Sequence, residues 1–222
     1  MNEKSHLSHP TKMPCPTFDL GVIQSGCYKH CDYGQKGICY AKNNPHEYMP
    51  RRKRLLNRNN KLIKSARFVR TLSMEILAKS TSHFRFFSSG DFPNIEAFVK
   101  VMDLCKATPN VSYWIPTTRE DLLSKYLIED KNVIPPNVCI RLSNAMVDTP
   151  TPQFMKDFWY KYGVTFSETS SNKNNATCHA SLGKNGNCGL CRSCWNRNHK
   201  VTVYKIHGKT AVMKMKKLMV KI

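Results

Sequence analysis

Short apolar runs alternate with longer amphipathic segments along most of the chain. The short runs predict strands at residues 17–24, 83–87, 111–116, 138–142 and 164–166. Helical spacing of apolar residues predicts helices at 50–78 (with a break near Asn59 and Asn60), 94–106, 119–128 and 151–162. Strands that alternate with helices in this way indicate right-handed βαβ units and a mostly parallel sheet.

Five strands precede the last group of cysteines, which is too few for a closed eight-stranded barrel. We therefore expect an α/β fold, either a partial (βα) barrel or a small open parallel sheet. Residues 200–206 and 210–215 flank a glycine turn and predict a C-terminal β-hairpin. Residues 1–170 would form the α/β core, and residues 171–222 a cysteine-rich metal loop with a basic hairpin tail packed on that core.

Ten cysteines in 222 residues fall mainly into two groups. The N-terminal array is Cys27, Cys31 and Cys39. The C-terminal array is Cys178, Cys188, Cys191 and Cys194. Thiolates at such short spacing can converge on a soft metal centre, and four ligands close a site whereas three leave a coordination position open. The sequence therefore predicts an open N-terminal centre and a closed C-terminal one.

Other side chains leave alternatives for both arrays. Cys15 could serve as a fourth ligand of the N-terminal array and close it. His179 or His199 could replace a thiolate in the C-terminal array, which suits either a zinc knuckle or an auxiliary iron–sulfur cluster. We favour iron–sulfur there and expect Trp195 to shield the centre. Cys105 and Cys139 fall in a predicted helix and strand, where a free thiol behaves as a small hydrophobe.

The chain lacks an apolar signal segment near Met1 and any run of about 18 apolar residues. We expect no transmembrane segment and a cytoplasmic location, where cysteines bind metal more often than they form disulfides. The net charge is +20, with nine basic residues and no acid over 51–70, and no acid after Glu168. Such stretches favour a nucleic-acid or nucleotide partner, although a general solubility effect is the alternative.

Small polar residues follow each predicted strand. Cys27 follows the first, residues 88–91 the second, residues 117–119 the third, Ser143-Asn144 the fourth and residues 167–169 the fifth. The carboxyl ends of parallel strands share one edge of a sheet, where ligands bind, so these residues should converge beside the N-terminal array. The alternative is that they only cap the following helices. No GxSxG, P-loop or HExxH motif occurs, so the candidate catalytic acids are Asp91 and Glu168.

A three-cysteine loop after the first strand, together with the Ser-Ser-Gly-Asp-Phe loop at 88–92, resembles radical S-adenosylmethionine (SAM) enzymes. The resemblance implies a [4Fe-4S] cluster, SAM as cofactor and a host reductant. By it, Gly90 and Asp91 would meet the SAM amino group, Ser143 and Asn144 the ribose, and Glu168 the far side. The chain departs from the usual pattern, because seven residues separate Cys31 from Cys39.

A second resemblance covers nearly the whole chain. Cys39-Tyr-Ala, the Arg/Asn-rich helix, the 84–92 segment and Cys188-Gly-x-Cys-Arg-x-Cys-Trp are similar to the phage and prophage family called gene product 88. This resemblance implies a viral or mobile-element origin and treats both arrays as parts of one unit. Our leading interpretation is a phage iron–sulfur protein that acts on a nucleotide or nucleic acid if it is catalytic. The alternative is a non-enzymatic, metal-stabilised nucleic-acid-binding protein.

Overall fold

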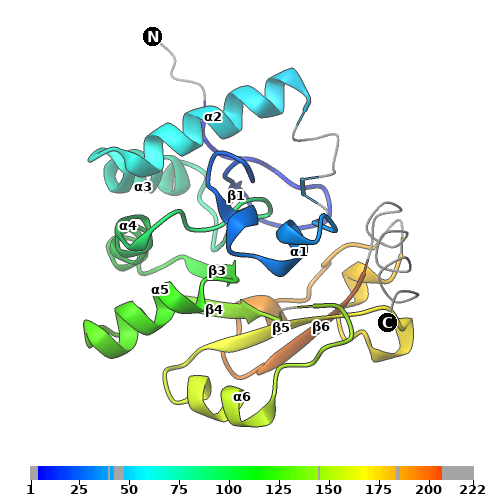
Figure 1. The fold of residues 1–222 in the computed structure, drawn as a ribbon. Helices are drawn as coiled ribbons and strands as arrows, with labels where there is room; N and C mark the ends of the chain where they lie inside the picture. Colours follow the sequence, from blue (N-terminus) through cyan, green and yellow to red (C-terminus); the bar gives the residue numbers. More distant parts are fainter. Residues whose placement is uncertain (1–4, 40, 43–47, 145, 184–185, 207–222) are drawn as a thin grey trace.

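Six parallel strands lie side by side in the order in which they occur along the chain, in a computed structural model (Figure 1). It describes residues 5–39, 41–42, 48–144, 146–183 and 186–206. The strands are β1 (Thr17–Phe18), β2 (His83–Phe86), β3 (Ser112–Thr117), β4 (Val138–Ser143), β5 (Thr165–Ser170) and β6 (Val201–Lys205). The predicted α/β fold with an open parallel sheet is confirmed.

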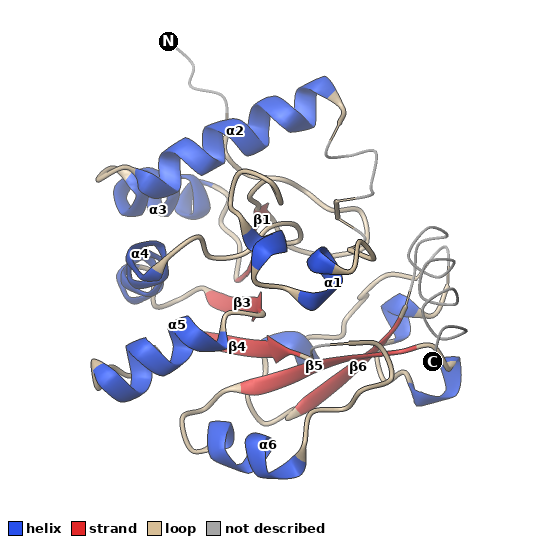
Figure 2. Cartoon of the chain, in the orientation of Figure 1, coloured by secondary structure: helices blue, strands red, loops and turns tan. Residues whose placement is uncertain are grey.

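Five helices follow one another along the outer side of the sheet (Figures 1 and 2). They are α2 (Pro50–Lys64), α3 (Phe68–Ala78), α4 (Ile95–Ala107), α5 (Glu120–Ser124) and α6 (Gln153–Tyr160). A π-helical turn (Lys125–Glu129) continues α5, and the short α1 (Asp32–Gln35) lies in the loop after β1. Successive parallel strands joined by crossovers of one hand place their connections on the same face, which explains this arrangement.

The two faces of the sheet differ in chemistry. On the helix-covered face, neighbouring strands pair Phe18 with Phe86, Ile115 with Ile140, and Leu142 with Phe166, and these side chains enter the main hydrophobic core. The opposite face, which we call the polar face, carries Arg85, Trp114, Arg141, Ser167, Thr202 and Tyr204. Because side chains alternate along each strand, the same strands supply both faces.

Two sequence expectations need correction, and a third lies partly outside the described residues. The break in the long helix lies at Ser65, not at Asn59 and Asn60. Asn59 is buried within α2 and donates to the carbonyl oxygens of His6 and Asp19, both at 2.9 Å, so tertiary partners hold it inside the helix. The first strand ends at Phe18 and is only two residues long. The strand expected at 200–206 pairs in parallel with β5, and the rest of the expected hairpin, residues 207–215, lies outside the described residues.

Local expectations that depend on a single side chain fare better. The Asn94 side chain caps α4 and accepts from the Ala97 N–H at 3.0 Å. Cys105 in α4 and Cys139 in β4 are both fully buried, as expected for thiols that act as small hydrophobes. Among the residues described, no helix is both long enough and apolar enough to cross a bilayer.

Candidate functional site

The N-terminal array lies in the loop between β1 and α2. Cys27 begins a 3₁₀ turn (Cys27–Lys29), and Cys31 is the residue before α1. The chain then returns so that the backbone N–H of Cys39 donates to the Tyr33 carbonyl at 2.9 Å. In Figure 2 this loop lies beside the arrowheads of β3 and β4, at the carboxyl edge of the sheet.

The three thiols of this array share one neighbourhood with Asp91. Burial raises the pKa of Cys27 to about 12, and the charges of Asp91, Cys39 and Cys31 act in the same direction. Burial also raises the pKa of Cys31, where Cys39 and Asp91 again contribute. Metal-free, the Cys27 and Cys31 thiols therefore stay protonated at neutral pH. A bound cation would favour the thiolates.

Gly90 and Asp91 lie directly against the start of the array loop. The Leu20 N–H donates to the Ser89 carbonyl at 3.1 Å, and the Ser89 hydroxyl donates to the Leu20 carbonyl at 2.9 Å. Gly90 has a φ of +77°, and a Cβ there would lie 2.6 Å from the Leu20 carbonyl oxygen. Glycine is therefore required by both the backbone conformation and the close approach.

The Asp91 carboxylate is occupied by protein donors. One oxygen accepts from the Phe92 N–H and the Thr117 hydroxyl, and the other accepts from the N–H and hydroxyl of Thr118. Burial nevertheless outweighs these bonds and raises the pKa of Asp91. Asp91 therefore holds the loop after β3 in place, and its expected contact with a ligand amino group stays a prediction.

The remaining predicted residues separate into two positions. Asn144 faces the N-terminal array, because the Tyr33 hydroxyl donates to its Oδ1 at 3.5 Å, and Ser143 precedes it at the end of β4. Glu168 lies apart from them. Its carboxylate pairs with Lys156 of α6 at 2.7 Å and accepts from the Thr151 N–H at 3.0 Å. Side chains alternate along β5, so Glu168 and its neighbour Thr169 point to opposite faces of the sheet. Thr169 is the residue that interacts with Tyr33 of the array loop.

Cys15 belongs with the C-terminal array. It is buried, and burial raises its pKa to about 12, while the nearby charges that act on it include those of Cys188 and Cys194. The Cys188 N–H donates to the Lys12 carbonyl at 2.9 Å, which ties the two segments together. This placement argues against Cys15 as a fourth ligand of the N-terminal array.

Within the C-terminal array, Cys194 is the most buried thiol. Its sulfur lies 3.2 Å from the Tyr204 hydroxyl, and the charge of Cys178 acts on both Cys194 and Tyr204. Cys191 is exposed instead, with its sulfur 3.4 Å from the Ser193 hydroxyl. Of the two possible substitute ligands, His179 is also exposed and His199 is partly buried.

The thiols of each array are not gathered around a single point in this arrangement of side chains. Across the described ranges, no three or more His, Cys, Asp or Glu side chains are placed to hold a metal ion. The donor sets are nevertheless all thiol, which suits zinc or iron–sulfur clusters. The four sulfur ligands of a single zinc lie about 3.8 Å from each other, because each Zn–S bond is about 2.3 Å long. Sulfurs that bind different irons of one iron–sulfur cluster lie farther apart than this.

Arg141 is the most important residue that the sequence did not reveal. Its buried guanidinium donates to five backbone carbonyls and forms no ion pair within the described part of the chain. Those carbonyls belong to Phe166, Ser193, Cys194, Asn196 and His199. The sequence held one sign of this role, because Arg141 is a charged residue within the apolar run at 138–142 that predicts a buried strand. Arg141 fixes the cysteine-rich segment on the polar face.

Trp195 provides a second anchor for that segment. Its indole N–H donates to the Phe84 carbonyl at 2.8 Å, and its ring packs edge-on against His83 and Trp114 at centroid distances of 5.4 and 5.3 Å. Arg85 in turn lies over the Trp114 ring at 4.2 Å. The tryptophan therefore packs on the sheet beside the array, and its expected shielding role stays a prediction.

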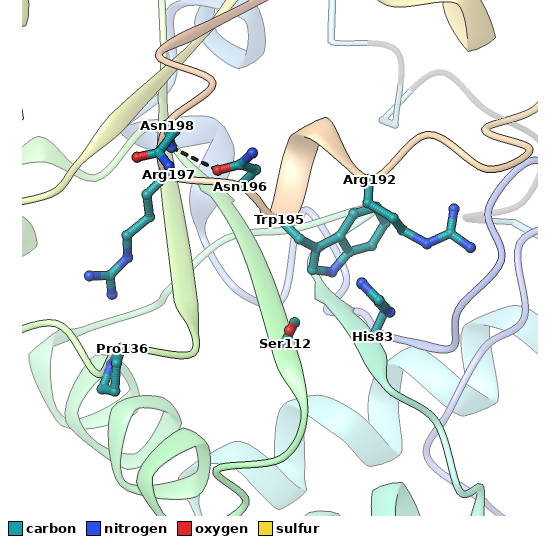
Figure 3. Close-up of a pocket in the computed structure, with 8 residues that line it drawn as sticks. All are labelled: His83, Ser112, Pro136, Arg192, Trp195, Asn196, Arg197 and Asn198. Carbon is teal, nitrogen blue, oxygen red and sulfur yellow. Dashed lines mark hydrogen bonds between the residues drawn. The ribbon is translucent and has the colours of Figure 1, made fainter.

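An open hollow of about 380 Å³ lies at the amino ends of β2 and β3, away from the N-terminal array (Figure 3). Its lining includes His83, Ser112, Arg192, Trp195 and Arg197. Arg197 points away from Arg192 in Figure 3 and donates to the Val138 carbonyl at 2.6 Å, so it serves the structure. Arg197 is therefore held by backbone carbonyls at the edge of the hollow.

Comparisons with known proteins give one match. The model of the family described as gene product 88 matches residues 3–197, which include all ten cysteines. No curated protein and no solved structure matches the chain. The matched family is not that of the radical SAM enzymes, so the resemblance to those enzymes stays a prediction.

Proposed function

Because the chain belongs to the gene product 88 family, whose model spans both cysteine arrays, we propose that both arrays hold metal–thiolate centres of the iron–sulfur type. The C-terminal centre is closed and structural. The N-terminal centre is open and is the functional one. SAM is the small ligand that we propose for its open position.

The placement of the N-terminal thiols carries this proposal. Cys27, Cys31 and Cys39 come together at the carboxyl edge of a parallel sheet, where ligands of such folds bind. Cys15, the one thiol nearby in sequence that could have closed the site, lies with the other array. A cluster held by three cysteines supplies an iron with a free coordination position.

The surrounding residues shape the space next to this position. The glycine loop at Gly90 packs against Leu20 at the start of the array loop, and Tyr33 reaches Asn144. Asp91 accepts four hydrogen bonds, and the three from Thr117 and Thr118 fix the start of the loop after β3. The Asn144 amide is occupied as well, because it donates to the carbonyls of Met146 and Thr149 and accepts from Tyr33. The backbone of the glycine loop is therefore the group that we propose for contacts to a small polar ligand, rather than the side chains of Asp91 and Asn144.

Metal analysis of protein purified without oxygen tests the proposal. We expect iron and sulfide in the protein, with a broad absorption near 400 nm that dithionite bleaches. Cys39→Ala should remove the iron of one centre and abolish SAM binding in equilibrium dialysis, while the other centre stays filled. Cys105→Ala removes a buried thiol from α4 and should leave both metal and SAM binding unchanged. Colourless protein that carries one or two zincs contradicts the iron–sulfur proposal.

One observation favours a second candidate, a zinc-stabilised nucleic-acid-binding protein. The outward side of α2 and the turn after it carries exposed cations, and no acid occurs in the sequence between Glu47 and Glu75. These cations are Arg51, Lys53, Arg54, Lys61, Lys64 and Arg67. A single-sign surface of this kind attracts a phosphate backbone without sequence specificity. Zinc content together with salt-dependent binding to DNA or RNA would support this candidate.

A further inference from the structure

The C-terminal array and the segment before β1 meet on the polar face of the sheet. Arg141 and Trp195 fix residues 193–199 on β4 and β2. The Cys188 N–H reaches the Lys12 carbonyl at 2.9 Å, and the Lys12 ammonium reaches the Gly183 carbonyl at 3.5 Å. Cys15, three residues after Lys12, is thereby brought beside thiols that lie more than 160 positions later in the chain.

This junction is rich in positive charge. The guanidiniums of Arg85 and Arg192 act on both Cys15 and Cys188, and those of Arg85 and Arg141 act on Cys194. Arg141 is completely buried, and its bonds are to neutral carbonyls. A buried cation is costly without a compensating anion. Four thiolates on a zinc ion or a cluster carry net negative charge and would supply that anion.

Unpartnered polar atoms on the same face point to a missing occupant. The indole N–H of Trp114 and the Nε–H of Arg85 are buried, and neither has a hydrogen-bond acceptor within the described residues. The hydroxyls of Ser167 and Thr202, which are neighbours across β5 and β6, are also buried and have no hydrogen-bond partner within the described residues. Buried polar groups of this kind normally have partners. Anionic sulfur accepts hydrogen bonds from such donors and is tuned by them.

We propose that Cys15 is a ligand of the C-terminal metal centre, together with Cys178, Cys188 and Cys194, and that Cys191 lies outside it. The inference rests on the proposed metal–thiolate nature of this array. Cys191 is the exposed thiol of the five, and its sulfur lies beside the Ser193 hydroxyl. Its charge acts on Cys188, so its exposure is the property that places it outside the centre. The centre then joins the segment before β1 to the segment before β6. Because it closes a loop of more than 160 residues, the bound metal stabilises the fold of the whole sheet.

Metal content in a protein with only this centre tests the ligand set. Cys27, Cys31 and Cys39 are first replaced by serine, so that the remaining metal reports the C-terminal centre alone. In this parent, Cys15→Ser should lower the metal per chain at least fivefold, whereas Cys191→Ser and the buried control Cys105→Ser should retain it. Loss of metal in Cys191→Ser with retention in Cys15→Ser overturns the inference but leaves the proposed function intact. If the parent variant and the wild-type protein both lack metal, the result contradicts the ligand set and the proposed function together.

A second measurement on the wild-type protein covers the case in which Cys15→Ser does not fold. Cys15 and Cys105 are both buried, so burial alone protects them alike from alkylation in mild urea. With metal bound, we expect Cys15 to react at least tenfold more slowly than Cys105, and Cys191 to react even without urea. Equal rates for Cys15 and Cys105 while the metal remains bound overturn the inference.

Discussion

The guanidinium of Arg141 on β4 donates to the Ser193 carbonyl at 2.7 Å, across 52 positions of sequence. The same side chain binds the carbonyls of Cys194 and His199 at 3.1 and 2.9 Å. One buried arginine therefore positions the backbone that carries the last cysteine of the C-terminal array. A charged side chain can do this because its planar donors reach several acceptors at once.

Replacing Arg141 with methionine should destabilise the protein by about 3 kcal/mol, since hydrogen bonds to a charged donor are lost and buried carbonyls are left unpaired. The free energy of unfolding in urea measures the effect, and limited proteolysis should show earlier cleavage within residues 188–199. Arg192→Met is the matched control, because among the described residues Arg192 donates to carbonyls of its own loop, at Gly189 and Cys191. Equal stability of the two variants would contradict the role of Arg141.

Gly90→Ala should cost more stability than Gly26→Ala. Both glycines have positive φ, +77° and +73°, so an alanine pays a similar backbone penalty of about 1 kcal/mol at each position. At position 90 the new Cβ meets the Leu20 backbone, at 2.6 Å, whereas at position 26 no atom of the described residues lies within 4 Å. We expect a further loss of about 1–3 kcal/mol for Gly90→Ala in urea unfolding. A difference near zero would show that the loop at 88–91 is not held against Leu20.

Asp19 should stabilise the protein in a pH-dependent way. Burial alone would raise its pKa, but the charge of Arg52 and hydrogen bonds from Arg52 and Ser88 outweigh burial and lower the pKa. The stabilisation is therefore fully present above the unfolded-state pKa of about 4 and is lost as the pH falls through the lower folded-state value. Asp19→Asn should cost about 2–4 kcal/mol at pH 7, and its difference from wild type should shrink below pH 4.

An exposed carboxylate provides the control for that titration. Asp103 pairs with Lys106 at 3.4 Å, and both side chains are about half exposed. Asp103→Asn should change the free energy of unfolding by no more than about 0.5 kcal/mol at any pH. If Asp19→Asn shows the same small effect, the ion pair between Asp19 and Arg52 does not stabilise the fold.

Local chemistry in the sequence predicts those parts of the structure that depend on nearby residues. The apolar runs that become β2 to β5 are recognisable because one face of each strand is buried under helices. Asn94 is recognisable as a cap because its side chain needs only the backbone three positions on. Asn59 looked like a helix break, since its partners, the carbonyls of His6 and Asp19, are distant in sequence.

The candidate sites show the same limit. The convergence of Cys27, Cys31 and Asp91 follows from the common edge of parallel strands, which the alternating pattern predicts. The position of Cys15 does not follow, because its proximity to Cys27 in sequence suggests the wrong array. The neighbours of Cys15 are determined by the antiparallel bridge between Ser8 and Thr17 and by the hydrogen bond from Cys188 to Lys12. No local sequence pattern predicts either contact.

The basic side of α2 makes a prediction that holds for either candidate function. Arg54 and Lys61 are exposed and lie two turns apart on one side of the helix, so each can contact a phosphate. Replacing both with alanine should lower the slope of log K against log salt by about 2 for duplex DNA, with little change in folding. Lys131 and Lys161 are equally exposed but lie beyond α5 and α6, so their double alanine variant should keep the wild-type slope. If the two double variants lose the same slope, binding reflects overall charge, and α2 is not a specific contact surface.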